Sequence, residues 1–183
     1  MKKILVCIDV QNDFITDALR NTDAIKKVPN IVNKLREFNG DAIIYTLDTH
    51  FDNYLDTKEG QKLPVKHCIK GSDGWKLHPE VEQEMLSAKL RGIRVFEIQK
   101  PTFGSTTLHD DIRSVVGNEE FEIEFCGFCT DICVVSNVLM TKAYFYETAN
   151  IYVDAKCCAG VTKESHEAAL TTMEMCQINI LNK

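Results

Sequence analysis

The sequence has no long hydrophobic run and no excess of positive charge. Its first residues, MKKILVCIDVQNDF, place two lysines and only five apolar residues before Asp9, which is too short for a signal peptide or a membrane span. The formal net charge of −6 provides no basic surface for nucleic acid. We therefore expect a cytoplasmic protein that binds neither nucleic acid nor membrane, with its eight cysteines present as reduced thiols.

The chain also lacks internal repeats, low-complexity segments and recognisable linkers. Its 183 residues are 44% hydrophobic and 26% charged, which is ordinary for a protein with a packed core. We therefore expect a single domain that spans residues 1–183. Nothing in this composition decides between a monomer and a homo-oligomer, so assembly as a homo-oligomer remains an alternative.

Prolines are few, and their positions bear on the segment CGFCTDICV, residues 126–134. Cys126 and Cys129 have the spacing of a thioredoxin-like redox pair, but that fold faces its pair with a later cis-proline, and all four prolines precede Cys126. A structural zinc site needs four ligands, and no second C-x-x-C is present. Cys126 is most simply a small apolar residue ending a buried strand. A thiol redox protein that uses Cys126 and Cys129 remains an alternative.

Short apolar runs alternate with amphipathic stretches. The runs predict strands at residues 3–8, 41–47, 93–98, 120–126, 150–154 and, more weakly, 178–181. Helical patterns occur at residues 21–38, 105–116, 130–147 and 162–176. This alternation predicts an α/β fold, a three-layer, doubly wound, mostly parallel six-stranded sheet with helices on both faces. Residues 49–79 show no clear periodicity, so we expect a functional loop region there.

Four polar residues lie at the ends of the predicted strands or just after them: Asp9, Asp48, Lys100 and Cys133. Ligands of an open α/β sheet bind beyond the carboxyl ends of its strands, so these residues should share one edge. Asp9, Lys100 and Cys133 can form a nucleophile with an acid–base partner, because a helix start and a nearby lysine both lower a thiol pKa. The competing interpretation is three unrelated residues: a buried aspartate, a surface lysine and a core cysteine.

A second polar group lies in LDTHFDNYLDTKEGQKLPVKHC, residues 47–68. Asp48 and His50 have D-x-H spacing, which points both side chains the same way on an extended segment. His67 follows 17 residues after His50. Two imidazoles and a carboxylate suit a divalent metal with open positions for water. A solvated loop with scattered polar groups is the competing interpretation, and D-x-H alone does not exclude it.

Six segments spread over nearly the whole chain match a known family: CIDVQNDF (7–14), DTH (48–50), LPVKHCIKGSDGW (63–75), QKPTFGST (99–106), GFCTDICV (127–134) and CCAGVTKESHEAALTTM (157–173). On these residues the chain resembles the nicotinamidase/pyrazinamidase-like members of the isochorismatase-like cysteine hydrolase superfamily. The first, fourth and fifth segments are typical of the superfamily in general. D-x-H together with HC-x-x-G is more particular to nicotinamidase-like members.

The resemblance implies a cysteine-dependent amidohydrolase of NAD metabolism. Such an enzyme converts nicotinamide and water to nicotinate and ammonia through a thioester acyl-enzyme. The resemblance assigns Asp9, Lys100 and Cys133 as the catalytic triad. It also implies a cis peptide between Phe128 and Cys129, and an oxyanion hole made by the backbone amides of Cys129 and Cys133.

The resemblance further implies a bound divalent metal that orients the substrate ring. Zinc is the first expectation, with iron or manganese as alternatives, because nitrogen and oxygen ligands do not select among them. Asp48, His50 and His67 are the implied ligands. Glu59 matches a position that ligates metal in some relatives, directly or through water.

The substrate pocket is less well defined by the sequence. Phe14 and Trp75 are candidates to stack on a flat ring, although core or lid packing explains each equally well. Relatives often have Gly-Gly before the Ala-Leu that follows the first motif, where this chain has ITDAL, residues 15–19. Because that loop shapes the pocket, a related hydrolase of another small amide or carbamoyl compound remains the alternative.

Overall fold

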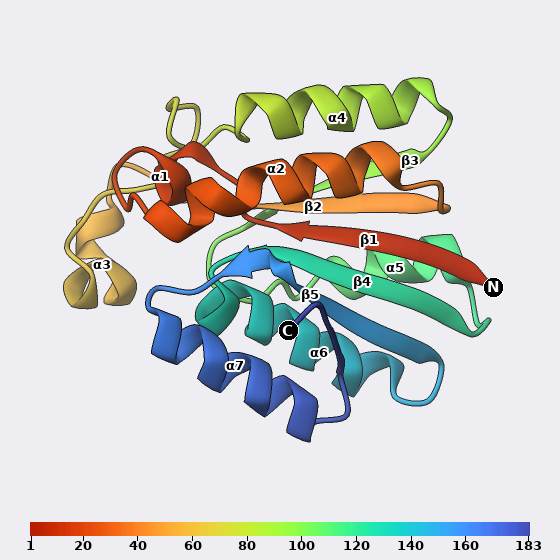
Figure 1. Ribbon diagram of the computed structural model, residues 1–183. Helices are drawn as coiled ribbons and strands as arrows, with labels where there is room; N and C mark the ends of the chain where they lie inside the picture. The colour runs from red at the N-terminus through yellow and green to blue at the C-terminus, as the bar shows by residue number, and fades with distance from the viewer.

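The computed structural model describes all residues, 1–183, and contains one sheet in the order β3-β2-β1-β4-β5-β6 (Figure 1). Every neighbouring pair is parallel. The predicted α/β sheet is therefore confirmed, and it is wholly rather than mostly parallel. The strands are β1 (Lys2–Ile8), β2 (Ala42–Asp48), β3 (Arg94–Lys100), β4 (Phe121–Phe128), β5 (Ala149–Ala159) and β6 (Asn179–Leu181).

Helices cover both faces of the sheet, as predicted (Figure 1). α2 packs against α4 on one face, and α6 contacts α5 and α7 on the other. No helix is both long enough and apolar enough to cross a membrane. The helices are α1 (Asn12–Ile15), α2 (Thr22–Glu37), α3 (Lys58–Lys62), α4 (Pro79–Leu90), α5 (Leu108–Val116), α6 (Val135–Phe145) and α7 (Lys163–Met175), with a 3-10 turn η1 (Tyr54–Asp56) and a π-turn η2 (Thr130–Val134).

The connection between β2 and β3 has more regular structure than its sequence pattern indicates. Residues 49–79, expected as a loop, contain η1 and α3, and α4 begins at Pro79, in the first-turn position that proline favours. In α4, Met85 is buried, whereas Leu86 and Leu90 are exposed. These exposed apolar residues blur the helical repeat, which is why the pattern did not predict α4.

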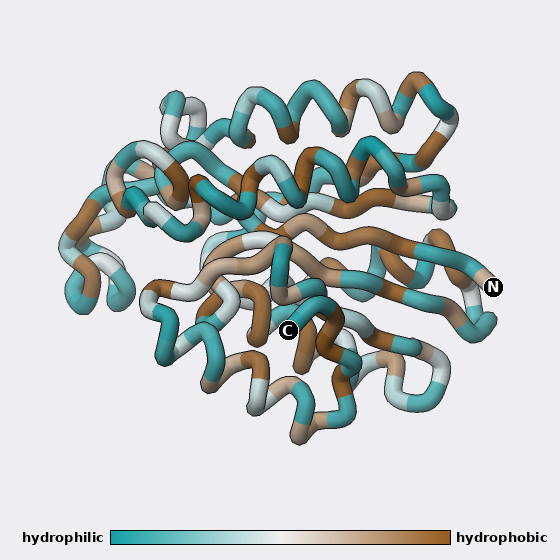
Figure 2. The backbone as a smooth tube through the Cα atoms, viewed as in Figure 1, coloured by the Kyte–Doolittle hydropathy of each residue, from teal (hydrophilic) through white to brown (hydrophobic).

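The core lies between the sheet and the two helical layers. β1 is buried continuously from Ile4 to Ile8, as expected for a central parallel strand covered on both faces. Figure 2 shows this apolar band through the middle of the molecule, while α2 alternates between apolar and polar residues. α2 buries Val28, Ile31 and Leu35 along one face, at the spacing of a helix packed on a sheet.

The strand order reverses between β1 and β4, and ligands of doubly wound sheets bind at such a reversal. Asp9 follows β1 with a φ of 48°, a left-handed conformation that aspartate tolerates better than most residues. Gly127 in β4 has a φ of 120°, and a Cβ there would lie 2.0 Å from the carbonyl oxygen of Ile8. Only glycine therefore fits at this position, which brings the end of β4 against β1.

Candidate active site

Asp9, Lys100 and Cys133 meet at the carboxyl edge of the sheet. Lys100, the last residue of β3, places Nζ 2.6 Å from Asp9 Oδ2 and 3.6 Å from Cys133 Sγ. Lys100 is 1% exposed, so it is not a surface lysine, and Asp9 and Cys133 are also buried. A buried ammonium requires such partners because its desolvation is costly. The three side chains form one contiguous cluster, and its catalytic role remains a prediction.

Burial and neighbouring charges set the proton affinities in this cluster. Burial raises the pKa of Asp9, although the Lys100 ammonium acts in the opposite direction. For Lys100, burial disfavours the ammonium, but the neighbouring Asp9 carboxylate raises its pKa above the usual value. Burial and the Asp9 carboxylate raise the pKa of Cys133 well above the ordinary thiol value, against Lys100. The expectation of a lowered thiol pKa is therefore wrong for the free site, because desolvation outweighs the lysine.

Thr46 on β2 fixes the carboxylate of Asp9. Thr46 Oγ1 donates to Asp9 Oδ1 at 2.6 Å, and it accepts a hydrogen bond from the Asp9 backbone N–H at 3.1 Å. These bonds leave the other carboxylate oxygen facing Lys100. Thr46 lies inside a strand, where a threonine is common, so the sequence carried no signal for this contact.

The turn that carries Cys133 lies between β4 and α6. The peptide between Phe128 and Cys129 is cis, as the resemblance implies. The Cys129 amide, which precedes η2, donates no hydrogen bond to a backbone carbonyl. In the same turn, the buried Thr130 places Oγ1 2.8 Å from His166 Nδ1 of α7, so a second helix supports the turn.

Cys126 lies inside the sheet. Its Sγ is 3.5 Å from Cys7 Sγ on β1, and both residues are fully buried. The contact with Cys7 and burial raise the pKa of the Cys126 thiol well above the ordinary value. Thiol–disulfide exchange needs a thiolate, so this environment favours a packing role for Cys126 over a redox role.

A second cluster combines Asp48, His50, Glu59 and His67. One donor atom from each residue lies within 4.8 Å of the others. His50 Nε2 is 3.0 Å from Asp48 Oδ2 and 3.5 Å from Glu59 Oε1, and His67 Nε2 is 3.5 Å from Asp48 Oδ2. Two imidazoles and two carboxylates whose donor atoms converge in this way fit a divalent cation.

Neighbouring polar groups orient two members of this second cluster. The fully buried Gln11 accepts from the Asp48 backbone N–H at 2.8 Å and donates to the Asp48 carbonyl oxygen at 2.9 Å. His67 Nδ1 lies 2.8 Å from the carbonyl oxygen of Val65, which leaves Nε2 to face the cluster. Such outer contacts fix the orientation of metal ligands.

The two predicted pocket aromatics lie close to the second cluster. The Phe14 ring is buried and meets the His67 ring edge-on, with 5.8 Å between the centroids. Trp75 is partly buried, and its Nε1 donates to Thr49 Oγ1 at 2.9 Å. Both positions are compatible with packing around the cluster, and ring binding by Phe14 or Trp75 remains a prediction.

Lys100 connects the two clusters. Asp48 and Lys100 are register partners at the ends of β2 and β3, and Lys100 Nζ lies 3.5 Å from Asp48 Oδ1. Burial raises the pKa of Asp48, but hydrogen bonds from His50 and His67 and the Lys100 charge outweigh it, so the Asp48 carboxylate stays ionised. The Cys133 thiol, the Asp9 carboxylate and the group of candidate metal ligands therefore lie together at one edge of the sheet.

Known proteins are similar to this chain over nearly its whole length. The model of the isochorismatase domain family matches residues 3–182. A Bacillus subtilis (strain 168) isochorismatase family protein, PncA, is 29% identical over 179 residues, 93% of each chain. The nicotinamidase of Escherichia coli (strain K12) is 25% identical over 198 residues, 94% of this chain and 90% of that one. The crystal structure of nicotinamidase/pyrazinamidase PncA from Bacillus subtilis superimposes with a TM-score of 0.85 at 26% identity, covering 100% of both chains.

Proposed function

The chain belongs to the isochorismatase family, and from its site we propose that it is a nicotinamidase, which hydrolyses nicotinamide to nicotinate and ammonia. One observation carries this proposal. Lys100 Nζ lies within 3.6 Å of Asp9, Cys133 and Asp48, so it touches both the nucleophile cluster and the cation-binding cluster. A redox protein or a simple binding protein has no need of this combination.

The first half of the proposed reaction forms a thioester on Cys133. Asp9, whose pKa is raised, accepts the thiol proton of Cys133, and Lys100 stabilises the resulting thiolate. The thiolate attacks the carboxamide carbon, and the backbone amides of Cys129 and Cys133 hold the oxyanion. Asp9 then gives its proton to the leaving nitrogen, the C–N bond breaks, and ammonia departs.

The second half regenerates the thiol. Asp9 takes a proton from water, and the oxygen attacks the thioester carbonyl carbon. The C–S bond breaks, nicotinate leaves, and the proton returns to Cys133. One water is consumed. Its oxygen enters the product carboxylate, one of its protons replaces the Cys133 proton that left with ammonia, and its other proton is released when the product acid ionises, so the cycle is balanced. Asp9 can act in both halves because Thr46 and Lys100 hold its two oxygens.

Asp48, His50, Glu59 and His67 would hold a divalent metal, with zinc as the first candidate and iron or manganese as alternatives. A bound metal supplies a Lewis-acidic position for the pyridine nitrogen and so orients the ring. Phe14, beside His67, is proposed to limit the pocket on the ring side. We also propose that residues 1–183 form one domain and that the protein, with eight unpaired cysteines, is cytoplasmic.

Ammonia release from nicotinamide, with and without a chelator, tests the function. We expect turnover that falls after chelation and returns when zinc, iron or manganese is added. If the protein released ammonia from a different small amide and none from nicotinamide, amide hydrolysis would stand as the reaction, but nicotinamide would not be the substrate. No ammonia from any carboxamide after metal addition would refute the proposal.

A further inference from the structure

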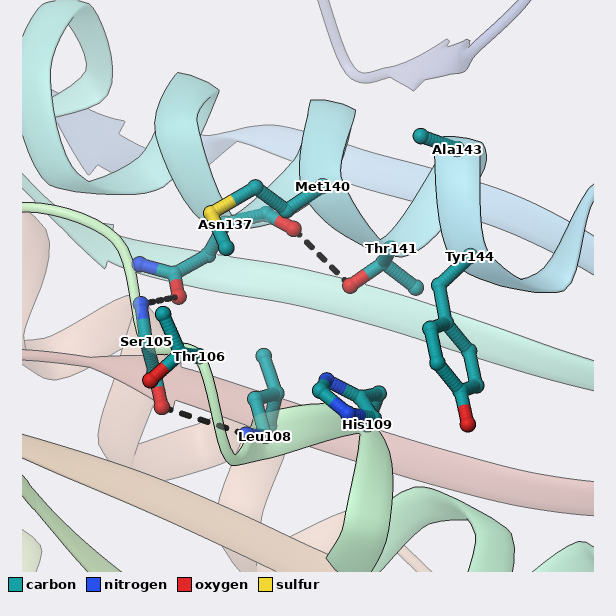
Figure 3. Close-up of a pocket in the computed structure, with 9 residues that line it drawn as sticks. All are labelled: Ser105, Thr106, Leu108, His109, Asn137, Met140, Thr141, Ala143 and Tyr144. Atoms are coloured by element: carbon teal, nitrogen blue, oxygen red, sulfur yellow. Dashed lines mark hydrogen bonds between the residues drawn. The ribbon is translucent and has the colours of Figure 1, made fainter.

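Asn137 lies on α6, one helical turn after Cys133, and its side-chain amide is fully buried. Nδ2 donates to the carbonyl oxygen of Cys133 at 2.7 Å and to that of Phe103 at 3.0 Å. Oδ1 accepts the backbone N–H of Ser105 at 2.9 Å, a bond drawn in Figure 3. Because both donors meet carbonyls and the acceptor meets an N–H, only one orientation of this amide satisfies all three partners.

The partners of Asn137 belong to two segments that meet at the nucleophile. Phe103 and Ser105 follow β3, whose last residue is Lys100. Lys100 Nζ donates to the carbonyl oxygen of Thr102 at 3.1 Å, so this segment also contacts the ammonium. The carbonyl of Cys133 belongs to the π-turn η2. A single amide therefore joins the lysine-bearing segment to the thiol-bearing turn.

Residues 101–105 also approach α6 very closely. A Cβ on Gly104 would lie 2.6 Å from Sδ of the flexible Met140 side chain and 3.5 Å from Ser136 Cβ, so the segment packs directly on α6. This approach brings Ser105 within reach of Asn137. The packing and the hydrogen bonds therefore favour the same placement of the segment.

We propose that Asn137 is a positioning residue, which fixes the distance between Lys100 Nζ and Cys133 Sγ by holding the segment after β3 against the nucleophile turn. The inference rests on the proposed amidohydrolase reaction. It assigns Asn137 no contact with substrate or metal. The cation-binding cluster of Asp48, His50, Glu59 and His67 lies on β2 and on the connection that follows β2. Asn137 makes no hydrogen bond to either segment.

A cavity beside Asn137 should allow its side chain to be shortened while the protein still folds. Asn137, Ser105 and Thr141 border a cavity of about 430 Å³ between α5 and α6 (Figure 3). A shortened side chain at position 137 therefore enlarges an existing space instead of opening a new one in the core. Thr141 provides the matched control. It is buried on the same helix, and its Oγ1 donates only to the Asn137 carbonyl oxygen at 2.8 Å.

The test compares Asn137→Ala with Thr141→Val in the metal-loaded protein. For Asn137→Ala we expect kcat to fall about 10- to 100-fold, because a misplacement near 1 Å has effects of this size. KM and metal content should stay within about threefold of wild type, since the ring-binding side is untouched. Alkylation of Cys133 by iodoacetamide should slow and shift to higher pH, because the lysine that favours the thiolate is no longer held. Thr141→Val should match wild type in all four measurements.

Two results would overturn the inference. One is a folded Asn137→Ala protein with wild-type kcat and alkylation profile. The other is an equal loss of kcat in Thr141→Val. That result would mean that any substitution that weakens α6 lowers turnover, whether or not it removes the Asn137 amide. If Asn137→Ala does not fold, Asn137→Ser, which keeps one hydroxyl, is measured in its place with the same criteria. The alkylation profile needs no substrate, so it still tests Asn137 if the wild-type protein releases no ammonia from nicotinamide.

Discussion

Replacing Lys100 by methionine tests the proposed catalytic cluster most directly. Methionine keeps much of the side-chain volume and removes the charge that lies 2.6 Å from Asp9 Oδ2 and 3.6 Å from Cys133 Sγ. Without this charge, the thiolate loses its nearest cation and Asp9 loses its ion pair. The thiol pKa should rise further, and the proton transfer that starts the reaction should become less favourable.

The distance between Lys100 Nζ and Cys133 Sγ sets the expected loss of kcat. Two unit charges 3.6 Å apart attract by about 4 to 5 kcal/mol at an effective dielectric constant of about 20. Each 1.4 kcal/mol of transition-state stabilisation is worth about tenfold in rate. Water entering the vacated space recovers part of the loss, so we expect Lys100→Met to lose at least about 100-fold in kcat, with a smaller change in KM.

Lys34 offers a matched control for the loss of a paired lysine. Its ammonium pairs with Glu124 and Asp154 on the sheet, outside both clusters. Lys34→Met should lower stability but leave kcat and the alkylation of Cys133 unchanged. A folded, metal-containing Lys100→Met protein that is alkylated by iodoacetamide with the wild-type pH profile, and turns over normally, would refute the role of Lys100.

Other predictions address the nucleophile, the metal and the fold. Cys133→Ala should abolish amide hydrolysis, whereas Cys126→Ala and Cys129→Ala should keep much of it; near-native turnover by Cys133→Ala would exclude the thioester. Elemental analysis of unchelated wild-type protein should find about one transition-metal ion per chain, and His67→Ala should lower both this content and the turnover of nicotinamide. Traces of metal only, with no gain in activity on addition, would contradict the metal site. Thr162→Ala should cost about 1 kcal/mol in chemical denaturation, because Thr162 Oγ1 accepts the Ser165 N–H that caps α7, without changing kcat; an unchanged midpoint would show that the cap is dispensable.

The strand ends were the part of the site that the sequence predicted well. Parallel strands share a carboxyl edge, so residues that end or follow neighbouring strands lie near one another, whatever their separation along the chain. This reasoning placed Asp9, Asp48, Lys100 and Cys133 together, and the structure has them there. The resemblance added Glu59, whose spacing gives no such signal because it lies in a connection.

The supporting contacts were not predictable in this way. Thr46, Gln11 and Asn137 each make hydrogen bonds to a segment that is distant in sequence, and their residue types do not indicate those partners. The pKa of Cys133 was predicted with the wrong sign for a related reason. The position of a residue at a helix start is visible in the sequence, but the burial of its thiol depends on packing from several elements.

The residues proposed for the reaction and those that shape the substrate pocket are held by different parts of the chain. Asp48 and Lys100 pair at the ends of these strands, so the backbone hydrogen bonds of the sheet set their relative position. Glu59 and His67 come instead from the connection of residues 49–79, which also carries the exposed Phe51 and Leu55. Changes in that connection can reshape the pocket without moving Lys100, Asp9 or Cys133. The amide chemistry is consequently more firmly determined by this fold than the identity of the ring that it accepts.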